Sequence, residues 1–461
     1  MRMRAIVLMG AVLALAGIAH AQWNPPQGQW GKTEPTDVRV MTWNVRDTIC
    51  SSNDKIGGTS DWGSVARIIA LLKPDILIIQ EAGDNSGNGT GSGVDSPAVL
   101  ANVFRLLIEG GNDPYNGNVP ITGYVQAWAP GYYLPYVYVN TLNDGFNRNM
   151  ICSRWPFADL NGDSQSVIGD ISFVQANAGG YAQGGNGGIR GFAFAEIDLP
   201  DETYLGDMVM GCVHMRSGGA ASDLAERLRA STNVAYYIDH IFNGGGQGIP
   251  DPFNQISDSP QVQTVLGPET AVIWGGDLNE DELTNGRKGP AEWLTQAQLA
   301  GGTDGTDRDR SDSTYDSATD PFTGVRTTQG TSSKLDYLCW QDSIATARRQ
   351  FVFYSVSIPI SPPSVIPPEF SGLTRPRDLS PAASDHRPVI IDFILPLVPP
   401  CACDRSVGDT NDDCQVNGAD LSVLLGQFGQ VVLPGTGADL NSDGAVNGAD
   451  LSVLLSNFGC Q

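Results

Sequence analysis

Residues 271–279, AVIWGGDLN, form an apolar run that ends in a carboxylate and a carboxamide, Asp277 and Asn279. Such a run predicts a buried strand with polar side chains at its end. Further polar residues border apolar runs in a fixed order: Asn44 in MTWNV, Glu81 in ILIIQE, His214 in VMGCVHMRSG, Asp336 in SKLDYL, and Asp385 with His386 in ASDHRP. Carboxylates, carboxamides and imidazoles at strand ends are groups that a divalent metal and a phosphate ester require.

The remaining periodicity predicts many strands and few helices, which favours a mixed-sheet α/β sandwich over a regular βαβ array. Strands are expected at 38–43, 75–80, 150–155, 192–199, 208–215, 271–276, 335–340, 351–358 and 388–395. Helices are expected at 61–72, 96–109 and 222–241, the last carrying His240 in a structural role. Polar, glycine-rich stretches at 84–95, 176–190 and 300–332 indicate surface insertions.

The chain has 461 residues, 41% of them hydrophobic, and a net charge of −24. This length suits one large domain and a small one. The strong negative charge disfavours nonspecific binding to nucleic acid, because phosphate groups repel it. Cleavage of a phosphoester is not excluded, since bound cations would offset local carboxylates.

The first 21 residues have the pattern of a secretory signal. Arg2 and Arg4 precede the apolar stretch IVLMGAVLALAGI, and Ala19-His20-Ala21 is a small-x-small cleavage site. A membrane anchor is the alternative, but the apolar stretch is short for a bilayer span. We therefore expect cleavage after Ala21 and a secreted, extracellular, monomeric protein.

Export permits disulfide bonds, and the cysteines form two groups of four. The first group is Cys50, Cys152, Cys212 and Cys339, and the second is Cys401, Cys403, Cys414 and Cys460. Four cysteines allow three pairings, among which the sequence does not choose. Cys212 and Cys339 lie in apolar strands, where buried free thiols are equally compatible with the pattern.

An internal repeat follows a proline-containing linker at 396–403. GDTNDDCQVNGADLSVLLGQFG (408–429) matches ADLNSDGAVNGADLSVLLSNFG (438–459), and predicts a duplicated module over 404–461. Positions 1, 3, 5, 7, 9 and 12 of two twelve-residue loops are Asp409, Asn411, Asp413, Gln415, Asn417 and Asp420, and Asp439, Asn441, Asp443, Ala445, Asn447 and Asp450. Alternating short oxygen side chains of this kind bind Ca²⁺. Gly444 suits the sharp turn at position 6, whereas Cys414 replaces glycine in the first loop.

Each loop is followed by a predicted helix but is not preceded by one. In this the module resembles a dockerin domain, a duplicated F-hand calcium module. The resemblance implies a small α-helical domain and a cohesin-like partner. Gly418-Ala419 and Gly448-Ala449 stand where that family reads its partner, but they lack obvious anchoring chemistry.

Residues 38–395 resemble the endonuclease/exonuclease/phosphatase superfamily, the deoxyribonuclease I-like fold. WNV, QE, HMRSG, GDLN, LDYL and SDHRP stand where that family carries its motifs, and NRNMICSRWP (147–156) resembles its central stretch. The resemblance implies a four-layer sandwich of two mixed β-sheets flanked by helices, with a metal site at one rim.

The resemblance and side-chain chemistry together imply a role for each residue. Glu81, supported by Asn44 and Asp385, would bind Mg²⁺ or Mn²⁺. Asp277 would position or deprotonate the attacking water, and Asn279 would hold a phosphate oxygen. His386 would contact the phosphate, Asp336 would orient His386, and His214 would bind a phosphate oxygen or assist the leaving group. Arg148, Arg216 and Lys334 could hold phosphate or be solvated.

These roles favour a secreted Mg²⁺-dependent phosphodiesterase, most readily a nuclease. A phosphatase or a sphingomyelinase-type phospholipase on the same site is the alternative among enzymes. The aromatic stretch YYLPYVYV (132–139) is either a membrane-contacting hairpin or a core strand. An alternative of another class is a dockerin-bearing binding or scaffold component with a non-catalytic main domain.

Overall fold

The structure, a computed structural model, describes residues 30–460 except 51–54, 84–89, 91–93, 144–146, 170–191, 237, 239–241, 243–260, 287–288, 296–312, 362–369, 371–374, 400–402 and 404. The chain forms two units, which divide between Pro396 and Leu397. Among the helices of the described ranges, none combines the length and apolarity that a membrane crossing needs. The predicted signal segment lies outside the described residues.

The main unit is built on two mixed six-stranded sheets, which confirms the predicted α/β class. Sheet 1 has the order β13 (Thr346–Val352), β14 (Val389–Ile394), β1 (Val38–Asn44), β2 (Ile76–Gln80), β6 (Met150–Ser153) and β5 (Tyr136–Val139). Sheet 2 has the order β11 (Ser313–Tyr315), β12 (Asp336–Gln341), β10 (Ala271–Asp277), β9 (Met208–His214), β8 (Phe192–Ile197) and β7 (Val167–Ile168). Parallel pairs β1–β2 and β10–β9 lie at the centre of each sheet, between antiparallel neighbours.

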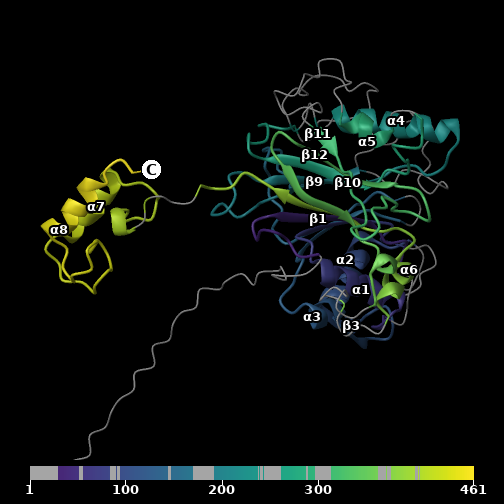
Figure 1. The fold of residues 1–461 in the computed structure, drawn as a ribbon, viewed down its shortest axis with the longest axis horizontal. Coiled ribbons are helices and arrows are strands. Elements are labelled where there is room, and N and C mark those ends of the chain that lie inside the picture. The colour runs from purple at the N-terminus through teal and green to yellow at the C-terminus, as the bar shows by residue number, and fades with distance from the viewer. Residues whose placement is uncertain are drawn as a thin grey trace, which may run out of the picture. The chain divides into compact units, whose positions relative to one another are not determined.

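Helices cover the outer face of each sheet (Figure 1). On sheet 1 they are α1 (Asp61–Leu72), α2 (Pro97–Glu109), α3 (Tyr124–Trp128) and α6 (Leu379–Ala383), with a small hairpin of β3 (Gly110–Asp113) and β4 (Val119–Thr122) beside them. On sheet 2 they are α4 (Ala221–Tyr236) and α5 (Pro290–Leu294). Three separate hydrophobic clusters, one beneath each helical layer and one between the sheets, make this a four-layer arrangement.

Side chains of β1 point alternately to the two faces of sheet 1, so this strand contributes to two of these clusters. Val38 and Val40 belong to the cluster between the sheets, whereas Met41 and Trp43 pack toward the helices. Successive side chains of a strand point to opposite faces, so a strand buried on both faces is apolar throughout. This is why the central strands read as continuous apolar runs in the sequence.

Most predicted strands and helices are present, with two differences. Residues 351–358 do not form one strand, because β13 ends at Val352 and a short 3₁₀ helix follows at Ser355–Ser357. The interpretation of 300–332 as a surface insertion is wrong for its described part, which contains β11. There the buried Asp316 carboxylate accepts hydrogen bonds from Lys334 Nζ at 2.5 Å and Leu338 N at 2.9 Å, which fixes this segment against β12.

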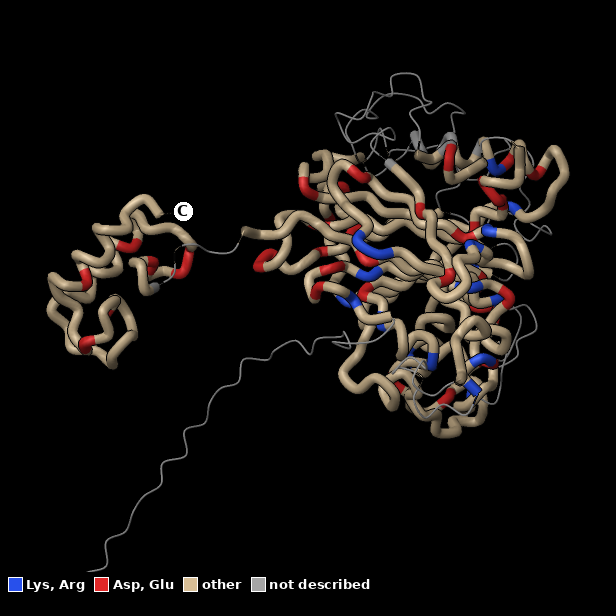
Figure 2. Tube along the Cα trace, in the orientation of Figure 1, with Lys and Arg blue, Asp and Glu red and all other residues tan. Residues whose placement is uncertain are grey.

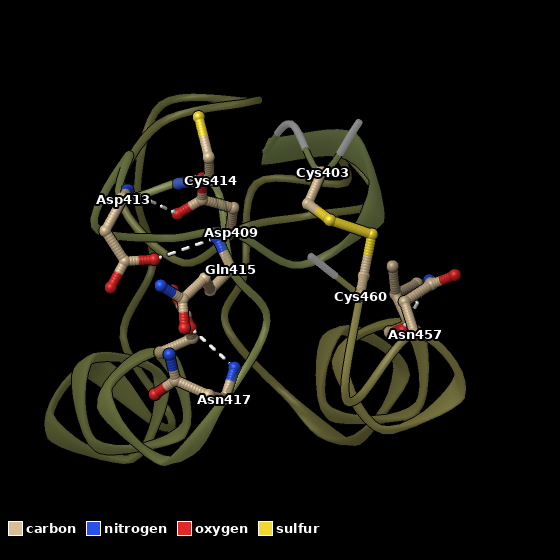
Figure 3. The surroundings of a disulfide bond; sticks show 10 residues. Cys403, Asp409, Asp413, Cys414, Gln415, Asn417, Asn457 and Cys460 are labelled. Carbon is tan, nitrogen blue, oxygen red and sulfur yellow. Dashed lines mark hydrogen bonds between the residues drawn. A yellow bond between two sulfur atoms is a disulfide. The ribbon is translucent and has the colours of Figure 1, made fainter. Parts of the chain in front are cut away.

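The C-terminal unit contains α7 (Gly418–Gln427) and α8 (Gly448–Ser456), each preceded by one of the two predicted loops. Its small core includes Val416, Leu424, Val446 and Leu454, and a disulfide joins Cys403 to Cys460 (Figure 3). The four cysteines of the main unit are buried free thiols. Asparagine caps both helices, and Asp420 and Asp450 complete reciprocal capping boxes.

Two adjacent glycines let β10 lie close to its neighbours. A Cβ on Gly276, whose φ is +145°, would overlap the carbonyl oxygen of Val213 in β9. A Cβ on Gly275 would overlap the carbonyl oxygen of Tyr337 in β12. Both of these carbonyl oxygens are backbone atoms, so neither can move aside without disrupting sheet 2.

We expect Gly276→Ala to lower the free energy of unfolding by at least about 3 kcal/mol, since it adds a backbone clash to an unfavourable φ. Gly286→Ala is the matched control, because Gly286 also has a positive φ (+70°) but open space around its Cβ position. That control should cost about 1 kcal/mol. Urea denaturation measures both, and equal losses would contradict the close-approach explanation.

Candidate active site

Polar side chains from both sheets meet at one edge of the sandwich. Asn44 ends β1 beside Gln80 of β2, and Glu81 follows directly. In the other sheet Asp277 ends β10, paired with His214 of β9 on one side and with Asp336 of β12 on the other. The strand registers therefore bring residues separated by almost 300 positions to the same edge.

A hydrogen bond across the gap between the sheets connects the two halves of this cluster. The Asn44 Nδ2 group donates to Asp277 Oδ2 at 3.1 Å, and both side chains are almost fully buried. Asn44 Oδ1 accepts from the backbone N–H of Arg46 at 3.0 Å, which fixes the orientation of the amide.

Two imidazoles flank the same Asp277 oxygen. His214 Nε2 lies 3.3 Å from Asp277 Oδ2 and 3.8 Å from Glu81 Oε1. His386 Nε2 lies 3.8 Å from Asp277 Oδ2, while its Nδ1 hydrogen-bonds Asp336 Oδ2 at 2.9 Å. Six of the predicted residues thus lie together: Asn44, Glu81, His214, Asp277, Asp336 and His386.

Residues that the sequence analysis did not single out hold His386 in place. The Ser384 hydroxyl donates to the Asn44 carbonyl at 2.8 Å and accepts from His386 N at 3.0 Å. Trp43 Nε1 donates to the His386 carbonyl at 3.1 Å. Thr328 Oγ1 accepts the backbone N–H of Asp336 at 3.1 Å. Ser384 could have been found within the ASDHRP stretch, whereas Thr328 lies in a segment without a recognisable pattern.

The buried charges shift one another's pKa values. Burial alone would raise the pKa of Asp277, but the two histidines outweigh it and hold that pKa well below its usual range. Burial raises the pKa of Asp336, and His386 offsets part of this effect. Burial would lower the pKa of His386, but Asp336 and Asp277 outweigh it and raise the pKa to about 10. At neutral pH His386 is therefore a cation between two carboxylates.

The cluster has donors that fit a divalent cation. Single ligand atoms of Asp277, Asp336 and His386 lie within 4.8 Å of one another, and all three residues are buried. Because His386 is already hydrogen-bonded to Asp336, Glu81 and Asn44 offer oxygen atoms better suited to a hard cation. Three carboxylates, of Glu81, Asp277 and Asp336, face two imidazoles, so an added cation would help to balance the charge.

Two predicted site residues lie differently from expectation. Asp385 is paired with Arg46 at 3.8 Å, and its side chain is 41% exposed rather than turned into the cluster. Asn279 has a φ of +53°, its N–H bonds Asp277 Oδ1 at 2.9 Å, and its Nδ2 donates to the Met215 carbonyl at 2.9 Å. Asn279 thus joins the loops after β9 and β10. His240 lies outside the described residues.

The three cations considered for phosphate binding have internal partners. Arg148 is buried and donates to the carbonyls of Asp95 and Asn140. Arg216 pairs with Asp223 at 2.6 Å and with Glu226 at 2.9 Å, and Lys334 pairs with Asp316. These interactions position loops, so the predicted phosphate contacts are not supported for these side chains.

No model of a known protein family matches this sequence, and no curated protein matches it. Solved structures of endonuclease/exonuclease/phosphatase proteins match 78% of the chain. The protein from Beutenbergia cavernae DSM 12333 is 18% identical, with 72% of its own chain covered and a TM-score of 0.44. The protein from Bacteroides vulgatus is 13% identical, with 99% covered and a TM-score of 0.41. D. rerio TDP2, solved with a single-strand DNA product, is 11% identical over 78% of this chain and 99% of its own, with a TM-score of 0.39.

We expect Asp336→Asn to lower the pKa of His386 from about 10 by more than about one unit, because it removes the partner carboxylate. In the wild type the ion pair's contribution to stability is complete below pH 6.5 and is lost as the pH rises through about 10. In the variant this loss should begin at lower pH. Imidazole NMR titration in chelator and denaturation at several pH values measure both effects.

Asp201→Asn, at an exposed aspartate remote from the cluster, is the control and should leave the His386 titration unchanged. An unaltered His386 pKa in Asp336→Asn would show that this carboxylate does not govern the imidazole.

Proposed function

We propose that this chain is an exported, metal-dependent hydrolase of phosphoester bonds with the chemistry of the endonuclease/exonuclease/phosphatase enzymes. The observation that carries the proposal is the buried Asp277 carboxylate, flanked by His214 and His386 and linked across the sheets to Asn44. A cluster of paired ionisable groups at a strand edge costs folding energy, which favours a catalytic role over a purely structural one.

Glu81 and Asn44 are the side chains proposed to hold Mg²⁺ or Mn²⁺. Asp385, which is exposed outside the cluster, would be a more distant carboxylate. When bound, the cation would neutralise charge on the phosphate oxygens. Glu81 stands directly after β2 with a φ of +55°, and its carbonyl accepts from Asp47 N at 2.9 Å. This bend holds its carboxylate beside His214.

Asp277 suits the task of orienting the attacking water. Its depressed pKa keeps the carboxylate ionised, so it accepts a hydrogen bond from water well but is a weak proton acceptor. Between the two roles left open above, positioning is therefore favoured over full deprotonation. Asn279 would contribute indirectly, by holding the loop after β10 against the loop after β9 through its hydrogen bond to the Met215 carbonyl.

The histidines suit the phosphate itself. His386, protonated at neutral pH, can donate a charged hydrogen bond from Nε2 to a phosphate oxygen while its Nδ1–H donates to Asp336 Oδ2. His214, between Glu81 and Asp277, is placed to bind a second oxygen or assist the leaving group.

The proposed substrate is a phosphodiester, with extracellular nucleic acid as the first choice. A phosphatase would use the same groups. The phospholipase alternative needs an apolar surface near the site, and the candidate stretch 132–139 lies elsewhere. Its strand β5 pairs Tyr136 with Ser153, which pairs with Ile76, at the opposite end of β2 from Glu81. The exposed Tyr133 and Tyr136 are thus remote from the cluster, which disfavours this alternative.

A panel of DNA, RNA, sphingomyelin and a phosphomonoester, each assayed with magnesium and with chelator, separates these readings. Release from DNA or RNA alone supports a nuclease. Absence of magnesium-dependent release from every substrate would favour the alternative of a non-catalytic binding component.

We expect Glu81→Gln to reduce turnover by at least about 100-fold with the fold retained, because the change removes a ligand charge but almost no volume. Glu202→Gln, at an exposed glutamate remote from the cluster, is the matched control and should keep normal activity. Steady-state rates in magnesium, with circular dichroism as a check on folding, test this. Near-normal rates for Glu81→Gln would remove it from the metal site.

For the C-terminal unit we propose calcium binding by a dockerin-like module, and a cohesin-like protein as its partner. Ligand atoms of Asp409, Asp413 and Asp420 lie within 4.8 Å of one another. Cys414 does not distort its loop, because its N–H bonds Asp409 Oδ2 at 2.8 Å, as Gly444 N bonds Asp439 Oδ2 at 2.9 Å. Figure 3 shows Asp409, Asp413 and Gln415 around this loop, and acidic residues outnumber basic ones in both units (Figure 2).

We expect the segment 397–461 to gain helix when calcium is added, because its small core and clustered carboxylates need cations to fold. The second loop should bind more tightly, because the positive φ at position 6 is unfavourable for Cys414 (+63°) but not for Gly444 (+87°). Circular dichroism and calorimetry with Asp409→Ala and Asp439→Ala as matched variants decide this. Full helicity in chelator would contradict it.

A further inference from the structure

A loop of the main unit repeats the spacing of the two C-terminal loops. It runs from Asp159 to Gln165 with the sequence DLNGDSQ, between β6 of sheet 1 and β7 of sheet 2. The corresponding C-terminal stretches are DTNDDCQ (409–415) and DLNSDGA (439–445). Asp, Asn and Asp thus occupy positions 1, 3 and 5 in all three loops, with a carbonyl available at position 7.

The loop also has the same internal hydrogen bonds. Asp163 N donates to Asp159 Oδ1 and to Asn161 Oδ1, both at 3.2 Å, as Asp413 N does to Asp409 and Asn411 at 3.1 and 3.2 Å. Ser164 N donates to Asp159 Oδ2 at 2.9 Å, and Gln165 N to Asp163 Oδ1 at 2.8 Å. The first C-terminal loop has both of these as well, at 2.8 and 2.9 Å.

The backbone turns at the same two positions. Positions 4 and 6 have positive φ in every loop: Gly162 (+74°) and Ser164 (+68°), Asp412 (+61°) and Cys414 (+63°), Ser442 (+60°) and Gly444 (+87°). The three loops therefore turn in the same sense at the same two positions.

A carboxylate from another strand closes the main-unit loop. In each C-terminal loop the carboxylate at position 12 accepts a hydrogen bond from the backbone N–H at position 2. Thr410 N donates to Asp420 and Leu440 N donates to Asp450, both at 2.8 Å. In the main unit Leu160 N, at position 2, donates to Glu196 Oε2 of β8. Glu196 thus takes the place that Asp420 and Asp450 occupy in the C-terminal unit.

Glu196 is held against the loop from both sides and has an unused oxygen there. Its carbonyl accepts from Ala158 N at 3.1 Å, and its N–H donates to the Ser166 carbonyl at 2.9 Å. Its side chain is fully buried, and Oε1 has no hydrogen-bond partner among the described residues. In the described part of the chain no Lys, Arg or His forms an ion pair with it. Burial of an ionised carboxylate in this setting costs free energy, and a bound cation would offset that cost.

We propose that Asp159, Asn161, Asp163, the main-chain carbonyl of Gln165 and Glu196 form a calcium site in the main unit. One oxygen from each of the first four and two from Glu196 give six ligands, within the range that Ca²⁺ accepts. This proposal goes beyond phosphoester hydrolysis and does not depend on it.

The site has a structural role, because it is remote from the catalytic edge. Glu196 pairs with Val209 of β9, and His214 ends that strand five residues later, about 16 Å away at 3.3 Å per residue. The loop carries the chain from sheet 1 to sheet 2. A cation there would join this crossing to β8, and would stabilise the packing of the two sheets.

The test uses the full chain with Asp409→Ala and Asp439→Ala, which disable the C-terminal loops. Calorimetric titration with calcium, in millimolar magnesium to occupy the catalytic edge, should still show one bound ion. At a free calcium concentration of about 100 times Kd, the unfolding equilibrium constant should fall about 100-fold, with a higher Tm. Calcium binding is measured without reference to turnover, so this proposal and the hydrolase proposal can fail separately.

Adding Glu196→Gln should abolish the remaining site. Asp159→Ala, at an exposed position, provides a second variant should Glu196→Gln fail to fold. Asp201→Asn, added in the same background, is the control and should leave binding and the Tm shift unchanged. Absence of a bound ion in the double variant would overturn the proposal. Retention of the ion in either folded loop variant, Glu196→Gln or Asp159→Ala, would overturn it as well.

Discussion

The hydrogen bond from Asn44 to Asp277 is the contact on which the candidate site depends. It is made at the one edge where the central strands of both sheets end, and it crosses the space between them. A small shift of one sheet against the other would change the distances from Asp277 to Asn44 and to His386, because these partners come from the other sheet or from the loop before its strand β14. The apolar cluster between the sheets, which includes Val40, Ile78 and Ile273, therefore fixes the distances between the polar side chains of the candidate site.

Internal pairing of basic residues gives this acidic chain its electrostatic character. Arg39 pairs with Asp392, Lys55 with Asp113 and Arg227 with Glu280, all in the interior. These pairs fix strands and loops, but they leave fewer cations to attract a polyanion at the surface. Under the proposed function, attraction of a phosphate to this edge would fall to His386 and a bound metal. A net charge of −24 is then compatible with the proposed phosphoester substrate.

The polar residues at strand ends were predictable from the sequence. The hydrogen-bond and ion-pair partners that come from distant segments were not. Asn44, Glu81, His214 and Asp277 were recognised because a polar residue after an apolar run is a local signal. The partners of Arg148 and Arg216 were not, because their acceptors come from other segments and surface and buried arginines look alike in a sequence. Asp385 is exposed and lies 3.8 Å from Arg46, which sequence spacing does not reveal. Segment 300–332 looked like an insertion because it is rich in Gly, Ser, Thr and Asp, although Asp316 of its described part pairs with Lys334 in the interior.

The loop at 159–165 is a further case in which a partner from a distant segment could not be predicted from the sequence. Duplication made the C-terminal loops recognisable, since each carries its closing carboxylate on the helix that follows. In the main unit the closing carboxylate is separated from Leu160 by 36 residues and is supplied by strand pairing. A twelve-residue pattern cannot find such a partner. What identifies it is the physical cost of burying Glu196 without a cation, together with a backbone that has already adopted the conformation of its two counterparts. An ion held there would connect the loop to the strand pairing of sheet 2, whereas an ion in a C-terminal loop would connect that loop to the start of a helix.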